Sequence, residues 1–424
     1  MQRRHFLASV AGATAVLRPD ALKIVERAVR TVDDISPQDL AQDEDFWLQI
    51  RNAYTVERNV INLNSGSVSP APITVQQAMR RYLDVMNTSP SDWVDDVLIP
   101  LRDTVRQRLA ATFGADPEEI AITRNTTESL EAIQMGLELE PGDEVLTTTQ
   151  DYPSMLSAWR QRERRDGIVM KTFPFPTPPD SQDTLFRLFE ENVTSKTKVI
   201  LVCHITYTTG QIFPVRRIAE MARERGIFTL VDGAHAFAHF PYNGSELGVD
   251  AYGTSLHKWL NAPIGTGMLY VKKDRIPDIW SLTASPESMA GNIRKFEAIG
   301  THPVANWLSI TEALTFLEGI GIERKAARLH YLRRRWEERV EDLPGVTLYT
   351  PPEIEHGCGL GSMSIDGIGA RELTDLLRSR FKIHVRPRFV PNEFDCIRVT
   401  PNVFSTATEV DLFADAVGRI VNDR

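Results

Sequence analysis

A lysine between a histidine and a tryptophan marks the first stretch in which the sequence suggests chemistry. Residues 255–267 read SLHKWLNAPIGTG, which places Lys258 directly before a run of small and apolar residues. A lysine is usually a solvated surface charge. In an apolar setting its ammonium loses its proton more easily, and the free amine is then a nucleophile. Lys258 is therefore the first candidate for a catalytic side chain.

An aspartate upstream of Lys258 stands at the end of a predicted strand. The stretch FTLVDGAHA, residues 228–236, is apolar up to Asp232 and then turns to small residues. An aspartate at the carboxyl end of a parallel strand points into the crevice where such sheets bind ligands. A carboxylate there suits a metal ion, a ribose or a protonated ring nitrogen.

Two further stretches place polar and aromatic side chains after predicted strands. In ITRNTTESL, residues 122–130, Asn125, Thr126 and Thr127 precede a predicted helix, whose free N–H groups make an anion cradle. The alternative is plain capping, with Asn125 as N-cap and Glu128 three residues later. Tyr152, in DYPSM, follows the end of another predicted strand.

Together these groups suit one ligand that carries a phosphate, a basic ring nitrogen, a flat face and an aldehyde. Pyridoxal 5′-phosphate (PLP) has all four. Its aldehyde forms a Schiff base with a lysine, and an aspartate keeps its ring nitrogen protonated. The order along the chain, with the phosphate turn first, then the aromatic, the aspartate and the lysine, is typical of the aspartate-aminotransferase-like fold.

The elements that must position these residues alternate between strand and helix. Apolar runs predict strands over 120–123, 144–148, 198–204, 227–232 and 267–271, and helical patterns cover 128–137 and 214–225. This alternation indicates an α/β fold with a mostly parallel sheet covered by helices. A long helical pattern over 304–340, broken near 319–321, leads to a smaller α+β unit. Its strands are expected at 363–365 and 397–400 and its helices at 371–380 and 409–421.

A chain of 424 residues is long enough for two domains. We expect a signal peptide and mobile leader over 1–30, an N-terminal arm over 31–73, a large PLP-binding domain over 74–303, and a connecting helix with a small C-terminal domain over 304–424. The net charge of −9 argues against nucleic-acid binding, and the three cysteines have no metal-ligand or CxxC spacing.

The N-terminus, MQRRHFLASVAGATAV, has the features of a twin-arginine export signal. Arg3 and Arg4 precede a short apolar stretch with Ala13-Thr14-Ala15 as one cleavage site. The stretch is too short to span a bilayer, so no stable membrane insertion is expected. We expect a periplasmic protein that uses the twin-arginine export machinery; the alternative is a cytoplasmic protein with a frayed N-terminus.

Several longer motifs resemble one family. The stretch VDGAHAFAHFPYNGSELGVDAYGTSLHKWLNAPIGTGMLYV resembles the cofactor-lysine signature of class V aminotransferases, especially the isopenicillin N epimerase-like branch. CHITYTTGQIFPVRRIAEMARERG, FEAIGTHP and IRVTPNVFSTATEVD are similar to the family too, and the resemblance runs from about Leu63 to the C-terminus. It implies the PLP-dependent transferase fold type I, with a large domain and a small α+β C-terminal domain.

The resemblance implies a role for each cofactor-binding residue. Lys258 would form the Schiff base, Asp232 would pair with the ring nitrogen and His235 would bond the ring hydroxyl. Tyr152 would stack on the ring, where relatives often carry a histidine, and Tyr207 stands where many members have an asparagine beside the ring hydroxyl. The phosphate would be held by Thr126, Thr127, Ser255 and His257, and by Thr301 from the neighbouring subunit of a homodimer with shared sites.

The substrate would be an amino acid or peptide whose carboxylate is bound by the small domain. Arg398 is the expected clamp, because a planar guanidinium binds a carboxylate through two parallel hydrogen bonds. Asn64 and Arg386 are expected beside it, and Arg386 or Arg388 is an alternative for the clamp itself.

The sequence predicts the reaction less sharply than the cofactor. Transamination is the first expectation; an isopenicillin N epimerase-like racemase or a C–S lyase is the alternative enzyme, and a catalytically degenerate PLP-binding protein is the non-enzyme alternative. Cysteine desulfurases need a cysteine nucleophile on a mobile loop of the small domain. The corresponding stretch, IHVRPRFVPNEFDCIRV, carries only Cys396, on a predicted strand, so desulfuration is disfavoured.

Overall fold

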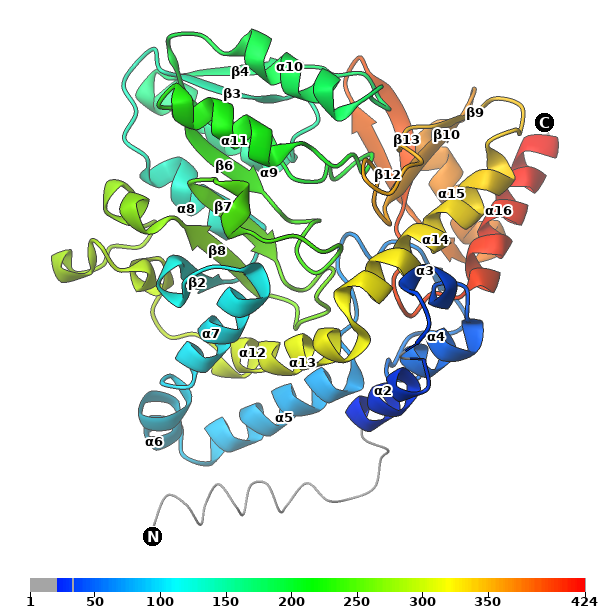
Figure 1. Cartoon of the computed structure of the whole chain (residues 1–424), viewed down its shortest axis with the longest axis horizontal. Helices are drawn as coiled ribbons and strands as arrows, with labels where there is room; N and C mark the ends of the chain where they lie inside the picture. Colours follow the sequence, from blue (N-terminus) through cyan, green and yellow to red (C-terminus); the bar gives the residue numbers. More distant parts are fainter. Residues whose placement is uncertain (1–20, 33, 424) are drawn as a thin grey trace.

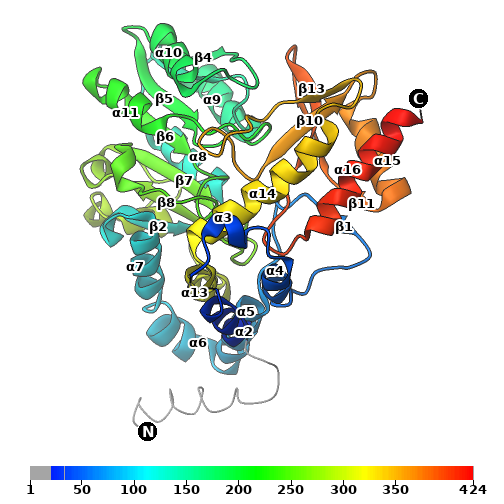
Figure 2. The same ribbon diagram turned by 45° about the vertical axis from the view of Figure 1, so that its right-hand side comes forward.

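The computed structural model describes residues 21–32 and 34–423. A large helix-covered sheet and a smaller sheet lie side by side, with helix α14 (Ile322–Val340) running between them (Figures 1 and 2). The predicted α/β class is confirmed. The predicted signal peptide lies outside the described residues.

The large sheet has seven strands in the order β2-β8-β7-β6-β5-β3-β4. Only β8 runs antiparallel to its neighbours. The strands are β2 (Ile120–Thr123), β3 (Glu144–Thr148), β4 (Val169–Phe173), β5 (Thr197–Cys203), β6 (Phe228–Asp232), β7 (Ala251–Ser255) and β8 (Gly267–Val271). Central strands of parallel sheets are buried on both faces, which is why β5 and β6 read as continuous apolar runs.

Successive residues of β5 enter different cores because side chains alternate across a strand. Val199 and Leu201 pack in the same cluster as Leu130 of α8 (Thr126–Gly136) and Trp159 of α9 (Pro153–Asp166). Ile200 and Val202 pack on the opposite face, which is covered by α7 (Arg102–Phe113), α10 (Gln182–Asn192) and α11 (Val215–Glu224). This two-sided packing fixes the strand ends at which the candidate residues stand.

The small domain has a four-stranded antiparallel sheet in the order β12-β13-β10-β9. It comprises β9 (Val346–Leu348), β10 (Gly361–Ile365), β12 (Arg386–Val390) and β13 (Phe394–Val399), with α15 (Ala370–Phe381) and α16 (Ala407–Asn422) packed against one face. The expected strands and helices are all present, and most boundaries shift by one to three residues.

The helical pattern over 304–340 forms three helices. They are α12 (Val304–Leu308), α13 (Ile310–Ile320) and α14, and the break expected near 319–321 falls at Gly321, whose φ of 89° is a left-handed conformation suited to glycine. Short helical turns connect other elements: η1 (Val94–Leu98), η2 (Pro117–Glu119), η3 (Ser245–Leu247), η4 (Lys273–Asp278), η5 (Glu287–Met289) and η6 (Ile293–Glu297).

The N-terminal segment is more ordered than the sequence suggested. Residues 21–30, which we expected in a mobile leader, form helix α2 (Ala21–Arg30), because Val25 and Ala28 share one helix face and are buried against α13. The segment continues through α3 (Pro37–Leu40), α4 (Glu44–Arg51), α5 (Ile73–Thr88) and α6 (Pro90–Trp93). Between α4 and α5, β1 (Ile61–Asn62) pairs in parallel with β11 (Ile383–His384), so part of the expected arm joins the small domain.

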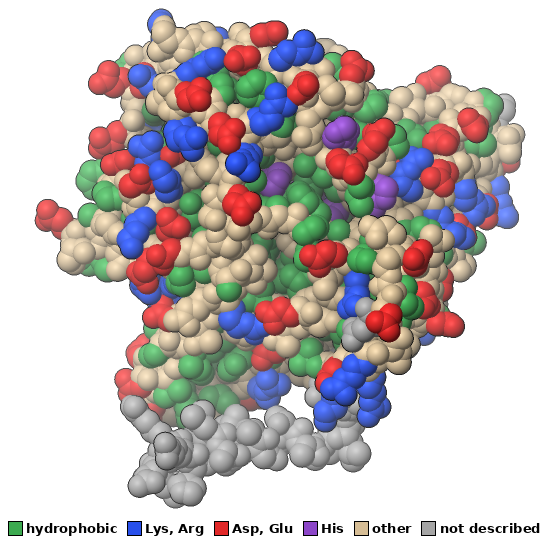
Figure 3. Space-filling model, viewed as in Figure 1, with side chains coloured by type: hydrophobic (Ala, Val, Ile, Leu, Met, Phe, Trp, Pro, Cys, Tyr) green, Lys and Arg blue, Asp and Glu red, His purple; other side chains and the backbone are tan. Residues whose placement is uncertain are grey.

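No helix within residues 21–32 and 34–423 is long and apolar enough to cross a membrane. Basic and acidic side chains are interspersed over the face shown in Figure 3.

Candidate active site

A pocket of about 410 Å³ lies where the carboxyl ends of the large-sheet strands meet the small domain. Every residue predicted for the site, apart from Thr301, lines it. These residues are Asn64, Thr126, Thr127, Tyr152, Tyr207, Asp232, His235, Ser255, His257, Lys258, Arg386 and Arg398. Residues far apart in the sequence thus converge on one cavity, as expected where an α/β sheet binds its ligand.

The anion cradle is built from the first turn of α8 and the end of β7. Asn125 is the N-cap, and its Oδ1 accepts a 2.9 Å hydrogen bond from the Glu128 N–H. Ser255 Oγ lies 2.7 Å from Thr126 Oγ1 and accepts from the Thr126 N–H at 3.0 Å. The capping interpretation is therefore correct, and it coexists with a pocket-facing helix N-terminus that suits a phosphate.

Gly267 allows strand β8 to lie against this turn. A Cβ at position 267 would stand 2.6 Å from the Asn125 nitrogen, closer than real Cβ atoms approach. Any larger residue would push the cradle away from the strand, so the glycine is required by close backbone approach.

Asp232 ends β6 inside the pocket and is 4% exposed. One carboxylate oxygen accepts a 2.9 Å hydrogen bond from the Ala234 N–H. Burial raises the pKa of Asp232, which the Lys258 charge partly opposes. A buried carboxylate with an incomplete set of partners favours a cationic or N–H partner from a ligand.

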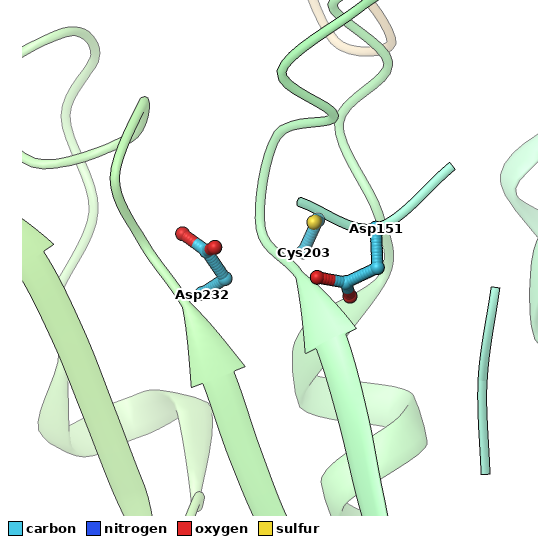
Figure 4. Close-up of side chains that lie close together, drawn as sticks. All are labelled: Asp151, Cys203 and Asp232. Atoms are coloured by element: carbon cyan, nitrogen blue, oxygen red, sulfur yellow. The ribbon is translucent and has the colours of Figure 1, made fainter. Parts of the chain in front are cut away.

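Asp151 and Cys203 lie beside Asp232, an association that the sequence did not reveal. Cys203 ends β5 in direct register with Asp232, and Asp151 follows β3, the next strand of the sheet (Figure 4). Asp151 accepts hydrogen bonds from Thr147 Oγ1 at 3.0 Å and from the Tyr152 N–H at 2.7 Å. Burial, followed by the charge of Asp232, raises the pKa of Asp151 to about 7.

Lys258 lies on the turn after β7 and contacts His235. Its Nζ is 3.4 Å from His235 Nε2, while Trp259 Nε1 donates to His235 Nδ1 at 3.3 Å. Burial lowers the pKa of His235, so the ring is neutral, and because Nδ1 accepts, its proton lies on Nε2, facing Lys258. Burial also lowers the pKa of Lys258 to about 8, which favours the nucleophilic free amine.

Two tyrosines stand on the other side of the pocket. Tyr152 and Tyr207 make an edge-to-face contact with ring centroids 5.2 Å apart. Tyr152 is 39% exposed whereas Tyr207 is buried, so the Tyr152 ring is the accessible one. An exposed aromatic at a pocket wall suits stacking on a flat ligand.

Arg398 reaches the pocket from β13. Its guanidinium donates to the Tyr207 carbonyl at 2.8 Å, to Ser67 Oγ at 3.1 Å and to Asn64 Oδ1 at 3.3 Å. The side chain is 1% exposed, and its Nε has no hydrogen-bond partner among the described residues. A buried cation held by neutral groups alone favours an anionic ligand.

Thr301 lies apart from this pocket. It is exposed and lines a second cavity with His302 and Trp307. Its expected contact with the phosphate of a neighbouring subunit stays a prediction.

The pocket fits PLP by the chemistry of its residues. The α8 N-terminus with Thr126 and Ser255 suits the phosphate, Asp232 the protonated ring nitrogen, and Lys258 the aldehyde. The buried carboxylate of Asp232 and the amine of Lys258 line one cavity. Burying either group without a partner costs free energy, and a ligand such as PLP would supply that partner.

A sequence model described as "Aminotransferase class-V" matches residues 61–387. The chain belongs to the class V aminotransferase family. The predicted family is thereby confirmed, and the family cofactor, PLP, is the cofactor of this chain. The pocket described above, whose residues fit PLP, is therefore the candidate PLP site.

Relatives of this class V chain have more than one activity. It is 28% identical to isopenicillin N epimerase of Streptomyces clavuligerus, over 89% of this chain and 99% of the relative. It is 30% identical to isopenicillin N epimerase of Amycolatopsis lactamdurans, over 88% of this chain and 98% of the relative. It is also 30% identical to a cysteine desulfurase of Haloferax volcanii, over 76% of this chain and 78% of the relative.

Solved structures agree on the fold. A cysteine desulfurase of Thermococcus onnurineus superposes with a TM-score of 0.77 at 22% identity, covering 88% of this chain and 98% of that one. A variant of C-DES with glycine covalently linked to PLP gives a TM-score of 0.76 at 23% identity, and the match covers 87% of this chain and 98% of that one. The predicted fold type I is confirmed.

Proposed function

We propose that this class V enzyme acts on an amino group next to a carboxylate, with transamination as its reaction. The observation that carries the proposal is the convergence of Lys258, Asp232 and Arg398 on one pocket from two domains. PLP, when bound there, would supply an electron sink for the substrate. The chain's own residues bind, orient and move protons around that substrate.

Each of the three side chains has a task that fits its position. The Lys258 amine, with its pKa lowered to about 8, takes up and returns protons near neutral pH. Asp232 would hold the protonated ring nitrogen of PLP through its carboxylate. Arg398 orients the substrate carboxylate, and its hydrogen bonds to Asn64 and Ser67 keep the guanidinium in place.

Epimerisation is the second candidate. It is supported by the epimerase relatives, which align over nearly their whole length. The sequence resemblance also favours it, because the epimerase-like branch tolerates a tyrosine such as Tyr207 where many class V members have an asparagine. A C–S lyase reaction needs no enzyme cysteine and stays an alternative, whereas a desulfurase reaction, which needs a cysteine nucleophile, has less support. All three cysteines are buried, and burial raises the pKa of Cys203, Cys358 and Cys396 above the ordinary thiol value. Buried, protonated thiols are poor nucleophiles.

One experiment separates these candidates. The PLP-loaded protein is incubated with amino acids and short peptides deuterated at Cα. Conversion of the cofactor to its pyridoxamine form supports transamination, whereas loss of deuterium without that conversion supports epimerisation. Release of sulfide or persulfide from cysteine or cystine would support a lyase. No spectral change with any substrate would indicate a binding protein and contradict the proposal.

We propose in addition that the enzyme is a periplasmic homodimer. Export is supported by the Arg3-Arg4 leader sequence alone, and the dimer by the resemblance of FEAIGTHP to the family motif. Thr301 is exposed and outside its own chain's site, which leaves it accessible to a partner subunit. Sedimentation of the purified protein tests the dimer directly.

A further inference from the structure

Arginine side chains gather on one face of the small-domain sheet where it meets the pocket. Arg386 and Arg388 alternate along β12, and Arg386 stands directly opposite Arg398 on β13. Because residues two apart on a strand share a face, the three guanidinium groups lie on the same side, and all three line the pocket. Ile397 and Val399 point the other way, into the core of the small domain.

This arrangement is unfavourable without an anion. Like charges directly opposite each other in a sheet destabilise it. Within residues 21–32 and 34–423, no ion pair involves Arg386, Arg388 or Arg398. Asp232 is the one carboxylate among the residues lining the pocket, and the lysine and the three arginines oppose it.

The buried atoms of these arginines point to a missing partner. The Nε atoms of Arg388 and Arg398 are buried and have no hydrogen-bond partner in the described part of the chain. The guanidinium of Arg388 lies over the Tyr207 ring, 5.2 Å from its centroid, so an aromatic face is its neighbour instead of a carboxylate. A guanidinium has five N–H donors, and leaving them unpaired in a buried site is costly.

One carboxylate cannot account for all three cations. Arg398 is fully buried and held by Asn64, Ser67 and the Tyr207 carbonyl, which suits a fixed clamp for the α-carboxylate. Arg388 is partly buried and Arg386 is exposed, so this pair extends from the clamp towards the solvent side of the pocket. A substrate side chain that leaves Cα in this direction would meet two further guanidinium groups.

We propose that Arg386 and Arg388 form a second anion subsite, and that the substrate is an amino acid with a carboxylate on its side chain. The inference rests on the proposed function, because it takes the α-carboxylate to be bound by Arg398. The second carboxylate replaces the missing counter-charge through charge-assisted hydrogen bonds, each strong enough to change affinity by at least about tenfold.

A binding test that requires no reaction probes the subsite directly. The affinity of the PLP-loaded protein for glutarate is compared by calorimetry with its affinity for glutaramate, the monoamide, and the shorter pair succinate and succinamate is run in parallel. These probes lack an amino group, so the result does not depend on the chemistry at the cofactor. A second arm compares L-glutamate with L-glutamine and L-aspartate with L-asparagine, using the visible absorbance of the bound cofactor.

The variants are Arg388→Gln, Arg386→Gln and the double substitution. Arg371→Gln is the matched control, because Arg371 is exposed on α15 of the same domain and does not line the pocket. We expect the wild type and the control to favour one dicarboxylate over its monoamide by about tenfold or more. In Arg388→Gln this ratio should fall several-fold, and in the double variant it should approach one.

Three results would contradict the proposal of a second anion subsite. They are equal affinity of the wild type for acids and amides, a ratio that survives the double substitution, and weaker PLP binding in the variants with the ratio intact. The last would mean that the arginines serve the cofactor phosphate. Failure of the proposed function looks different: no amino acid would change the absorbance, while the glutarate arm would still report on the anion subsite.

Discussion

Lys258 Nζ lies 3.4 Å from His235 Nε2, so the candidate Schiff-base amine is paired with a neutral histidine and not with a carboxylate. A carboxylate in contact would hold the amine as an ammonium, whereas a neutral ring leaves burial as the main influence on its pKa. Burial lowers the pKa of Lys258 to about 8, and the Asp232 charge opposes this shift. The pair is therefore arranged to keep the amine available near neutral pH.

The rate of PLP uptake by the cofactor-free protein should follow this titration. Only the free amine attacks an aldehyde, so the rate should rise with pH and level off above about pH 8 rather than near 10.5. Stopped-flow absorbance in the visible range measures it, and borohydride reduction followed by peptide mapping should locate the label on Lys258. Lys258→Ala should show no covalent uptake. A label on another lysine would contradict the assignment.

Asp232→Asn should lower turnover by about two orders of magnitude while leaving the fold intact. The amide keeps the shape of the side chain but loses the charge that holds a proton on the cofactor ring, and about 3 kcal/mol of lost stabilisation slows a step about a hundredfold. Removing the charge should also move the inflection of PLP uptake to lower pH, because Asp232 raises the pKa of Lys258. Unchanged rates and an unchanged inflection would show that Asp232 is not the ring partner.

The sequence was sufficient to predict the elements with continuous apolar runs. Strands β2, β3 and β8 have the predicted limits, because each contains a run of apolar or β-branched residues that suits a buried strand. Strand β7, AYGTS, was not predicted, since it contains small and polar residues and gains its place from pairing with β6 and β8. Helix α2 was missed because its packing partner, α13, is far away in the chain.

The candidate site was predictable where each residue follows a recognisable strand or motif. The proximity of Asp151 to Asp232 was not, since it depends on the spatial order β6-β5-β3, which the chain order does not give. The pairing of Arg386 with Arg398 depends likewise on the register of β12 and β13. The sequence predicted Arg386 beside Arg398 or in its place, and the register adds that the two stand directly opposite each other on one face.

Glu297→Gln should destabilise the large domain without altering the pocket. Glu297 is buried, accepts from the Ile122 N–H at 2.7 Å and pairs with Arg106, which is also buried. Neutralising Glu297 leaves the buried Arg106 with only the exposed Asp103, 3.2 Å from its Nε, as an ionic partner among the described residues, and breaking a buried pair costs about 3–5 kcal/mol. Thermal unfolding should show a clearly lower Tm. Glu118→Gln, at a more exposed ion pair with Arg294, is the control and should change Tm little.

Export should depend on the paired arginines near the N-terminus. Changing Arg3 and Arg4 together to lysine keeps the charge but removes the feature that the twin-arginine receptor reads. In a bacterial host with this pathway, we expect the variant to stay in the cytoplasm with its N-terminus uncleaved, whereas the unchanged chain reaches the periplasm. Fractionation and N-terminal sequencing measure both. Periplasmic recovery of the double variant would contradict export by this route.

Arg398 should matter for the substrate and little for the cofactor. Its guanidinium lies on the small domain, while the phosphate cradle and Lys258 belong to the large one, so replacing it should leave the visible spectrum of bound PLP unchanged. Two charge-assisted hydrogen bonds to a carboxylate are worth roughly 1.5–3 kcal/mol each, so Arg398→Ala should lower kcat/KM by about two to four orders of magnitude. Arg398→Lys should recover only part of this, because an ammonium cannot form the planar fork.

The effects of Arg398→Ala and Arg388→Ala together decide which arginine binds the α-carboxylate. Loss of the α-carboxylate clamp weakens every amino-acid substrate equally, whereas loss of the second subsite weakens only those with an acidic side chain. Arg398→Ala should therefore lower kcat/KM for glutamate and glutamine by the same factor, and Arg388→Ala should lower it selectively for glutamate. If Arg388→Ala affects both substrates equally and Arg398→Ala does not, the α-carboxylate is bound by Arg388 and the roles of the two arginines are exchanged.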